Sequence, residues 1–101
     1  MKGNTLAQFM DDILLTGGPE KEFVFRNQFF FLETVLCDDG ESHDLYIDVY
    51  DNSDPLDKKY IKTHHFVGKT MAECVSKFEC ATIFCGLTIY QAEQEIVVLF
   101  G

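Results

Sequence analysis

The chain has 101 residues, of which 47% are apolar, and its 17 acidic residues outnumber its 8 basic residues to give a formal net charge of −9. This length fits one domain with a single core, and the apolar fraction is too high for a disordered chain. The negative charge disfavours direct binding to nucleic acid, because it repels phosphates.

The acidic residues are concentrated in one stretch. Residues 27–57 contain no Lys or Arg and nine acids, namely Glu33, Asp38, Asp39, Glu41, Asp44, Asp48, Asp51, Asp54 and Asp57. The remaining eight acids and eight bases cancel. We therefore expect one acidic surface that attracts basic partners.

The N-terminal segment has helical periodicity. Apolar residues fall at i, i+3, i+4, i+7 and i+8, at positions Leu6, Phe9, Met10, Ile13 and Leu14. This spacing predicts an amphipathic helix over 5–15 with Asn4 or Thr5 as its cap. Gly17-Gly18-Pro19 is predicted to end it, because proline cannot continue a helix.

Residues 22–50 have the pattern of strands. Apolar and aromatic runs at 23–25, 29–37 and 45–50 predict a three-stranded antiparallel meander, with turns at 26–28 and 38–42. Asn27 is expected to adopt the positive φ of the first turn; alternatively, the first two runs form one long strand with a bulge. In the third run Tyr46, Asp48 and Tyr50 alternate with apolar residues and should share the solvent side.

Residues 51–57 are expected to form a loop, and a short fourth strand is an alternative at 60–63. The pattern Phe-x-Gly-x-Thr then occurs twice, ending at Thr70 and Thr88. Glu73 and Gln91 follow these threonines at the spacing of a capping box, which predicts two helix starts. The tail at 96–100 either extends the second of these helices or forms a closing strand, since it is rich in β-branched residues.

These elements predict an α+β domain spanning residues 1–101. An N-terminal helix precedes a three-stranded antiparallel meander, four-stranded if 60–63 joins it, and two short C-terminal helices pack on one face of the sheet. No export signal or apolar run of transmembrane length is present, so we expect a cytoplasmic protein with no membrane contact. Its cysteines, at 37, 74, 80 and 85, are then expected to be reduced.

Three partial motifs for ligand binding fail on inspection. Gly68-Lys69-Thr70 resembles the end of a phosphate-binding loop, but Thr63 occupies the position of the first glycine. His64 and His65 lack cysteines at zinc-ligand spacing. The aspartates at 48, 51, 54 and 57 do not fit a calcium loop. We expect no cofactor and no metal.

Candidate catalytic groups are also weak. Ser42-His43-Asp44 contains the residue types of a triad, but neighbours on a strand point to opposite faces. Glu33 interrupts an apolar face and is a candidate acid–base group, although the simpler interpretation is a glutamate that pairs with Arg26 or a lysine. We therefore expect no catalytic site and a protein that is not an enzyme.

The functional hypothesis is a protein-binding module. Tyr anchors and carboxylates are typical of a surface that docks on a basic protein. The candidate partner-binding residues are Asp38, Asp39, Glu41, Asp44, Tyr46, Asp48, Tyr50, Asp51, Asp54 and Asp57.

The element order and the acidity resemble those of some small phage-encoded anti-CRISPR and other anti-defence inhibitors. The resemblance rests on architecture and charge, not on a shared motif. It implies a nucleic-acid mimic that inhibits a nucleic-acid-binding protein, as a monomer or homodimer. The alternatives are a homo-oligomeric structural domain, which would use the Phe-rich second face of the sheet, and a small metal-binding protein or enzyme.

Overall fold

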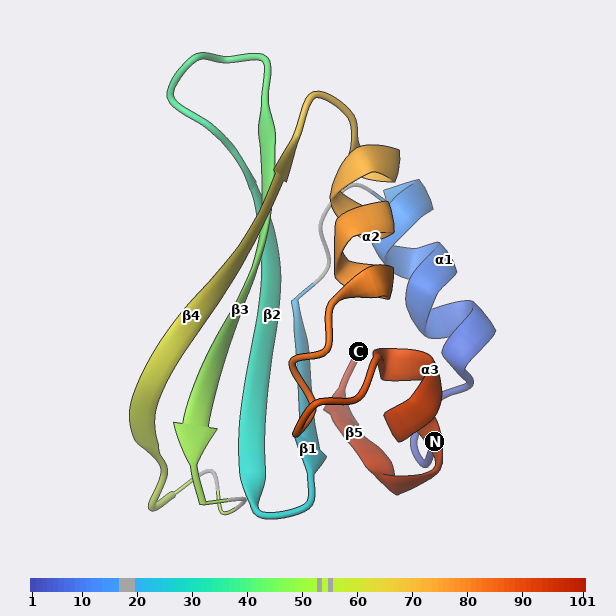
Figure 1. The fold of residues 1–101 in the computed structure, drawn as a ribbon, viewed down its shortest axis with the longest axis vertical. Coiled ribbons are helices and arrows are strands. Elements are labelled where there is room, and N and C mark those ends of the chain that lie inside the picture. The colour runs from blue at the N-terminus through green and yellow to red at the C-terminus, as the bar shows by residue number, and fades with distance from the viewer. Residues whose placement is uncertain (17–19, 53, 55) are drawn as a thin grey trace.

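The computed structural model describes residues 1–16, 20–52, 54 and 56–101. Its elements in chain order are α1 (Leu6–Thr16), β1 (Lys21–Phe25), β2 (Gln28–Leu36), β3 (His43–Asp51), β4 (Lys59–Gly68), α2 (Met71–Cys80), α3 (Ile89–Ala92), a 3-10 turn η1 (Glu93–Glu95) and β5 (Ile96–Phe100) (Figure 1). The predicted N-terminal helix is confirmed, with Thr5 accepting from the Gln8 amide. Its predicted stop at Gly17-Gly18-Pro19 lies outside the described residues.

The sheet has five antiparallel strands in the order β4-β3-β2-β1-β5. The α+β class is confirmed, but the prediction of three or four strands is wrong. The tail forms β5, which pairs with β1 and buries Ile96. The strand expected at 60–63 extends over ten residues, because β4 pairs along the whole of β3.

The first hairpin turn is tight, as predicted, but a different residue is left-handed. Arg26 has φ 53°, and Asn27 is not among the residues with positive φ. Two contacts hold Arg26 in this costly conformation. Its guanidinium lies 4.8 Å from the Phe25 ring centroid and donates two 3.1 Å hydrogen bonds to Glu95.

Both predicted helix starts are confirmed, although only one has a complete capping box. At α3, Thr88 and Gln91 exchange both capping hydrogen bonds. At α2, Thr70 accepts from the Glu73 amide, but the Glu73 carboxylate accepts from Lys69 instead of Thr70. A Cβ on Gly68 would lie 2.6 Å from the Glu73 Cβ, so this glycine makes room for that side chain.

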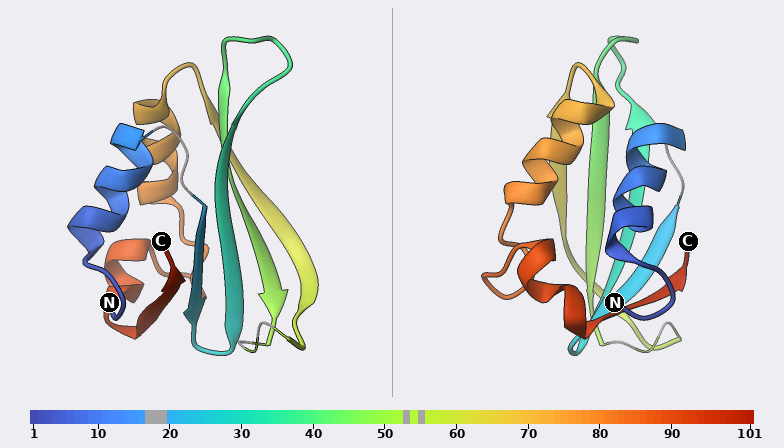
Figure 2. Two further views of the ribbon diagram at one scale, coloured as in Figure 1. Left: turned by 180° about the vertical axis from the view of Figure 1, so that it is seen from behind. Right: turned by 90° about the vertical axis from the view of Figure 1, so that its right-hand side faces the viewer.

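All three helices lie on one face of the sheet (Figure 2). The core between the two layers is rich in aromatic rings. Phe84 is fully buried, and its ring centroid lies 5.1 Å from that of Phe30 and 5.6 Å from that of Phe25. The helices leave the second face of the sheet uncovered (Figure 2). We call this second face, formed by the outward side chains of β1 to β4, the open face.

Candidate functional site

The open face brings together four of the ten candidate residues. Asp44, Tyr46, Asp48 and Tyr50 alternate with the buried residues of β3, as the sequence predicts. Asp38, Asp39 and Glu41 lie in the turn between β2 and β3 at one end of the sheet, whereas Asp51, Asp54 and Asp57 lie at the other end (Figure 1). The ten residues therefore do not form one patch.

Tyr46 is the centre of a cross-strand row on the open face. Glu33 of β2 and His65 of β4 are its direct neighbours in the register. The Tyr46 hydroxyl donates a 2.7 Å hydrogen bond to Glu33, and its ring lies 6.3 Å from the His65 ring. Burial and this hydrogen bond raise the pKa of Tyr46 to about 12, so the phenol remains a donor at neutral pH.

Asp44 lies beside this row and binds His65. The His65 Nδ1 is 2.7 Å from one Asp44 carboxylate oxygen, and the pair becomes an ion pair when the imidazole is protonated. The Asp44 side chain is only 15% exposed, whereas the His65 side chain is 58% exposed. The other Asp44 oxygen is buried and has no hydrogen-bond partner among the described residues.

A second chain of hydrogen bonds orients Asp48. The Thr63 hydroxyl of β4 donates to the Asp48 carboxylate, and Thr63 is itself 2.7 Å from the Tyr60 hydroxyl. Thr63 is also the direct cross-strand neighbour of Asp48. The carboxylate thus remains on the open face in a fixed orientation, which lowers the entropy that a partner must remove on binding.

An aromatic row covers the part of the open face where β3 ends and β4 begins. The Tyr50 ring lies 5.8 Å from Phe29 and 5.9 Å from Tyr60, in edge-to-face geometry in both cases. The Lys58 amine is 4.8 Å from the Phe29 ring centroid. Phe29 is therefore 1% exposed although it points away from the helices. The Phe-rich second face is less available to another copy of the chain than the sequence indicates.

The acids at the ends of the sheet have local structural contacts. Asp39 accepts hydrogen bonds from the Glu41 and Ser42 amides and from the Ser42 hydroxyl. These bonds lower the pKa of Asp39 to about 2, with the Ser42 amide as the largest cause. Asp39 thus closes the turn between β2 and β3, and a partner is not needed to explain its position.

Three further end acids, Glu41, Asp54 and Asp57, also have local contacts. Asp54 accepts from the Leu56 amide, and the Asn52 side-chain amide donates to the Asp57 carboxylate. Glu41 lies 3.6 Å from the Lys69 amine. These contacts favour turn formation and exposed ion pairing, each of which contributes little to binding.

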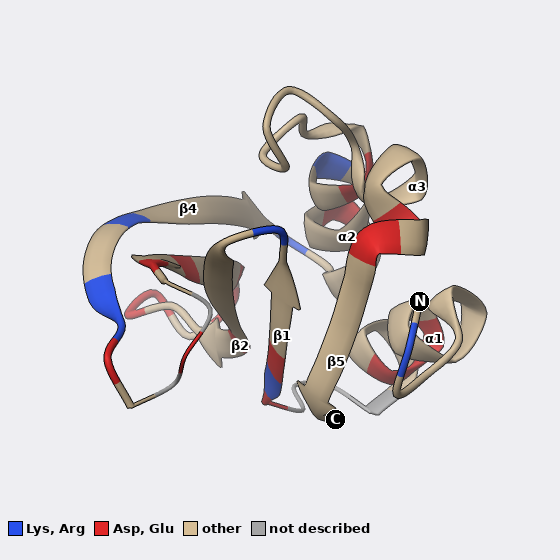
Figure 3. Ribbon diagram, turned by 90° about the horizontal axis from the view of Figure 1, so that it is seen from below, with Lys and Arg blue, Asp and Glu red and all other residues tan. Residues whose placement is uncertain are grey.

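The folded chain distributes charge more evenly than the sequence does. The strand β4 and its ends place Lys58, Lys59, Lys62 and Lys69 beside the acidic segment (Figure 3). Residues 27–69 then hold nine acids and four lysines, and the rest of the chain holds eight acids and four bases. The expectation that one side carries the whole imbalance is wrong in space, because β4 pairs antiparallel with β3.

The partial motifs do not assemble in the described part of the chain. Thr70 caps α2, and Ser42 binds Asp39 while Asp44 binds His65, so these groups do not form a triad. Glu33 binds Tyr46, whereas Arg26 pairs with Glu95, which replaces the predicted Glu33–Arg26 pair. Among the described residues, no three His, Cys, Asp or Glu side chains come together as metal ligands.

Sequence reasoning missed three members of the site: Glu33 as a neighbour of Tyr46, and Thr63 and His65. For Thr63 and His65 the missing information was the register of β4, which was expected to be short, and for Glu33 it was the register of β2 against β3. The β-branched residues Ile61, Thr63 and Val67 in this run were a usable signal for a longer strand.

Comparison with known proteins gives no matching family model, no matching curated protein and no matching solved structure. In the described ranges, no helix combines the length and apolar character that a membrane span requires. The four cysteines are free thiols.

Proposed function

We propose that this protein is a non-enzymatic binding module whose open face docks on a basic surface of a partner protein. The observation that carries the proposal is the set of three ordered carboxylates, Glu33, Asp44 and Asp48, on a sheet face that the helices leave uncovered. Each is held by a side-chain hydrogen bond, and Tyr46 lies between them. Ordered carboxylates beside aromatic rings favour Arg- and Lys-rich partners.

The sharper form of the proposal is that the partner binds nucleic acid and that the open face occupies its nucleic-acid site. Such sites combine basic side chains with aromatic platforms, and the open face offers anionic groups and rings to both. A partner of this kind would be competed by its own nucleic acid and released by salt.

Affinity capture with matched variants tests the proposal. Glu33→Gln/Asp44→Asn/Asp48→Asn removes three charges from the open face, and Asp11→Asn/Glu79→Gln/Glu93→Gln removes three from the helix layer. Both sets keep side-chain shape and one acceptor oxygen, and replace the other oxygen by an NH2 donor. We expect the helix-layer variant, but not the open-face variant, to capture the same basic protein as the parent.

Two results would contradict the proposal. Equal loss in the two variants would mean that net charge, not the open face, attracts the protein. Capture that persists at high salt and is unchanged by excess DNA would exclude an electrostatic nucleic-acid mimic.

Self-association is the second candidate function, and a particular patch favours it. Val35 and Val67 flank Asp44 on the open face and are 40% and 42% exposed. The edge of β4 is also long enough to pair with another strand. Light scattering across a concentration series separates the two functions, since a docking monomer keeps one mass.

A further inference from the structure

The inner face of β4 carries two basic side chains where a core strand normally carries apolar ones. The inward residues Phe66, His64 and Lys62 pair with the buried Leu45, Ile47 and Val49 of β3. The register then shifts between Val49 and Tyr50, so Ile61 is an extra residue. Such a bulge bends an edge strand, and the lower half of β4 curves away from the helices (Figure 1).

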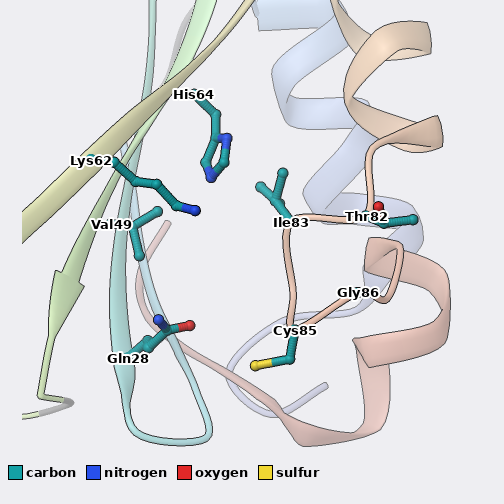
Figure 4. A pocket seen from close by; sticks show the side chains of 8 residues that line it. All are labelled: Gln28, Val49, Lys62, His64, Thr82, Ile83, Cys85 and Gly86. Atoms are coloured by element: carbon teal, nitrogen blue, oxygen red, sulfur yellow. The ribbon is translucent and has the colours of Figure 1, made fainter.

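This curvature leaves a pocket of about 300 Å³ between the sheet and the segment 82–86. Val49 and Ile83 form its apolar walls, and its polar groups are those of Gln28, Lys62, His64, Thr82 and Cys85 (Figure 4). None of the described residues that line it is acidic, although the chain has 17 acids. The pocket is therefore a locally cationic site in an acidic protein.

One buried polar atom in the pocket is unsatisfied. The His64 Nε2 is buried and has no hydrogen-bond partner among the described residues. The Lys62 side chain is exposed but enters the same pocket, and the structure gives it no ion pair within the described ranges (Figure 4). Buried polar atoms in folded proteins are normally paired, so an unpaired one beside a free ammonium indicates a place for an acceptor.

A strained turn forms the opposite wall. Cys85 has φ 52° and Gly86 has φ 82°, between reciprocal backbone hydrogen bonds of 3.1 and 3.0 Å that join Phe84 and Leu87. A non-glycine residue rarely adopts this conformation, and such residues are frequent at functional sites. The turn holds the Cys85 thiol at the pocket (Figure 4).

We propose that this pocket binds a small molecule through an oxyanion, a phosphate or carboxylate, that contacts the Lys62 Nζ and the His64 Nε2. The volume is at the lower end of small-molecule sites. Lysine and protonated imidazole are both strong donors to such anions. The site lies on the sheet face opposite the open face and does not rest on the proposed docking function.

Binding should strengthen as the pH falls, because the protonated imidazole always carries a hydrogen on Nε2 and adds a positive charge that attracts the anion. Burial, Lys62 and His65 lower the pKa of His64 in the empty pocket. The pocket around His64 also holds Cys85 of the 82–86 segment, which interacts with Arg26. The cross-strand neighbours that β3 places beside Lys62 and His64 are apolar. A bound anion opposes these causes, so it should raise the pKa of His64.

Histidine NMR tests this on the unmodified protein. Sodium phosphate and sodium acetate are titrated separately at constant ionic strength, and the ring signals of His43, His64 and His65 are followed against pH. We expect at least one anion to shift the His64 signals saturably and to raise its pKa. His65, on the open face, is the internal control, and its signals should respond less than those of His64, because it reaches the anion only through its charge interaction with His64.

Variants then locate the anion. Lys62→Met should weaken binding about tenfold, the typical effect of losing one charged hydrogen bond, whereas Lys59→Met should leave it unchanged. Amide spectra check that both variants fold. The proposal is overturned if neither anion gives a saturable His64 response, if His65 responds equally, or if Lys62→Met binds as the parent does.

Discussion

The hydroxyl of Tyr46 donates a 2.7 Å hydrogen bond to Glu33 across the pair of strands β2 and β3. The bond links β2 to β3 on the open face, and it fixes a carboxylate and a phenol in one orientation. It forms because the register places the two residues directly opposite each other, where side chains contact. The open face is thus ordered before any partner arrives.

This relationship predicts the alkaline behaviour of the protein. The pKa of Tyr46 is raised to about 12 from 10.0, first by burial and then by Glu33. The folded state therefore retains a proton that the unfolded state loses, so this contribution to stability is complete below pH 10 and is lost as the pH rises towards 12. Ultraviolet titration of Glu33→Gln should show a Tyr46 pKa nearer 10.0, and an unchanged pKa would contradict the assigned role of Glu33.

The lowered pKa of Asp39 predicts that stability is lost in acid, whereas the raised pKa of Tyr46 predicts a loss in alkali. Its pKa is lowered to about 2 from 3.8 by hydrogen bonds from the 41–42 backbone and Ser42. Its contribution is present above pH 3.8 and is lost as the pH falls through 2. Asp39→Ala should speed amide hydrogen exchange in the 37–42 turn, whereas Asp38→Ala should not. Equal exchange rates in the two variants would mean that Asp39 does not close the turn.

Truncation of Phe84 should lower the free energy of unfolding strongly. It is fully buried and contacts several aromatic rings, whereas Phe100 is 56% exposed. Phe84→Ala should cost about 3–5 kcal/mol of unfolding free energy, because the cavity cannot fully close. Phe100→Ala should change it by less than about 1 kcal/mol. Urea denaturation measures both, and similar losses would place Phe84 outside the core.

The ion pair between Lys21 and Asp12 should respond differently to the loss of each partner. Its side chain is 1% exposed, and its amine is 3.1 Å from Asp12 and 2.9 Å from the Gly101 carbonyl oxygen. Lys21→Met should stay within about 1 kcal/mol of the parent, since an apolar side chain can replace a buried charge. Asp12→Ala should destabilise more, because it leaves the buried ammonium without its carboxylate. Thermal unfolding of the two variants gives the order, and the reverse order would contradict this account.

Local patterns predicted the helices and the first three strands because each depends on short-range spacing. The Thr70 and Thr88 caps are examples, since a cap needs only residues within one turn. The alternation of β3 likewise assigned Tyr46 and Asp48 to the same face. These features do not depend on what the distant parts of the chain do.

Long-range features were not predictable in this way. Pairing of β5 with β1 depends on residues more than 70 positions apart, and the full length of β4 depends on its match to β3. The left-handed Arg26 depends on Glu95, which holds its guanidinium from the 3-10 turn. The site was incomplete for the same reason, because Thr63 and His65 reach it only through the register of β4.

The central claim, that the open face occupies a nucleic-acid site on a basic partner, is tested most directly by competition. The captured partner is purified, loaded with fluorescent DNA or RNA, and titrated with the parent and both triple variants. We predict that the parent and Asp11→Asn/Glu79→Gln/Glu93→Gln displace the nucleic acid at similar concentrations, and that Glu33→Gln/Asp44→Asn/Asp48→Asn needs at least about tenfold more, about the loss of one charged hydrogen bond. A ternary complex without displacement, or equal competition by all three proteins, would contradict the claim.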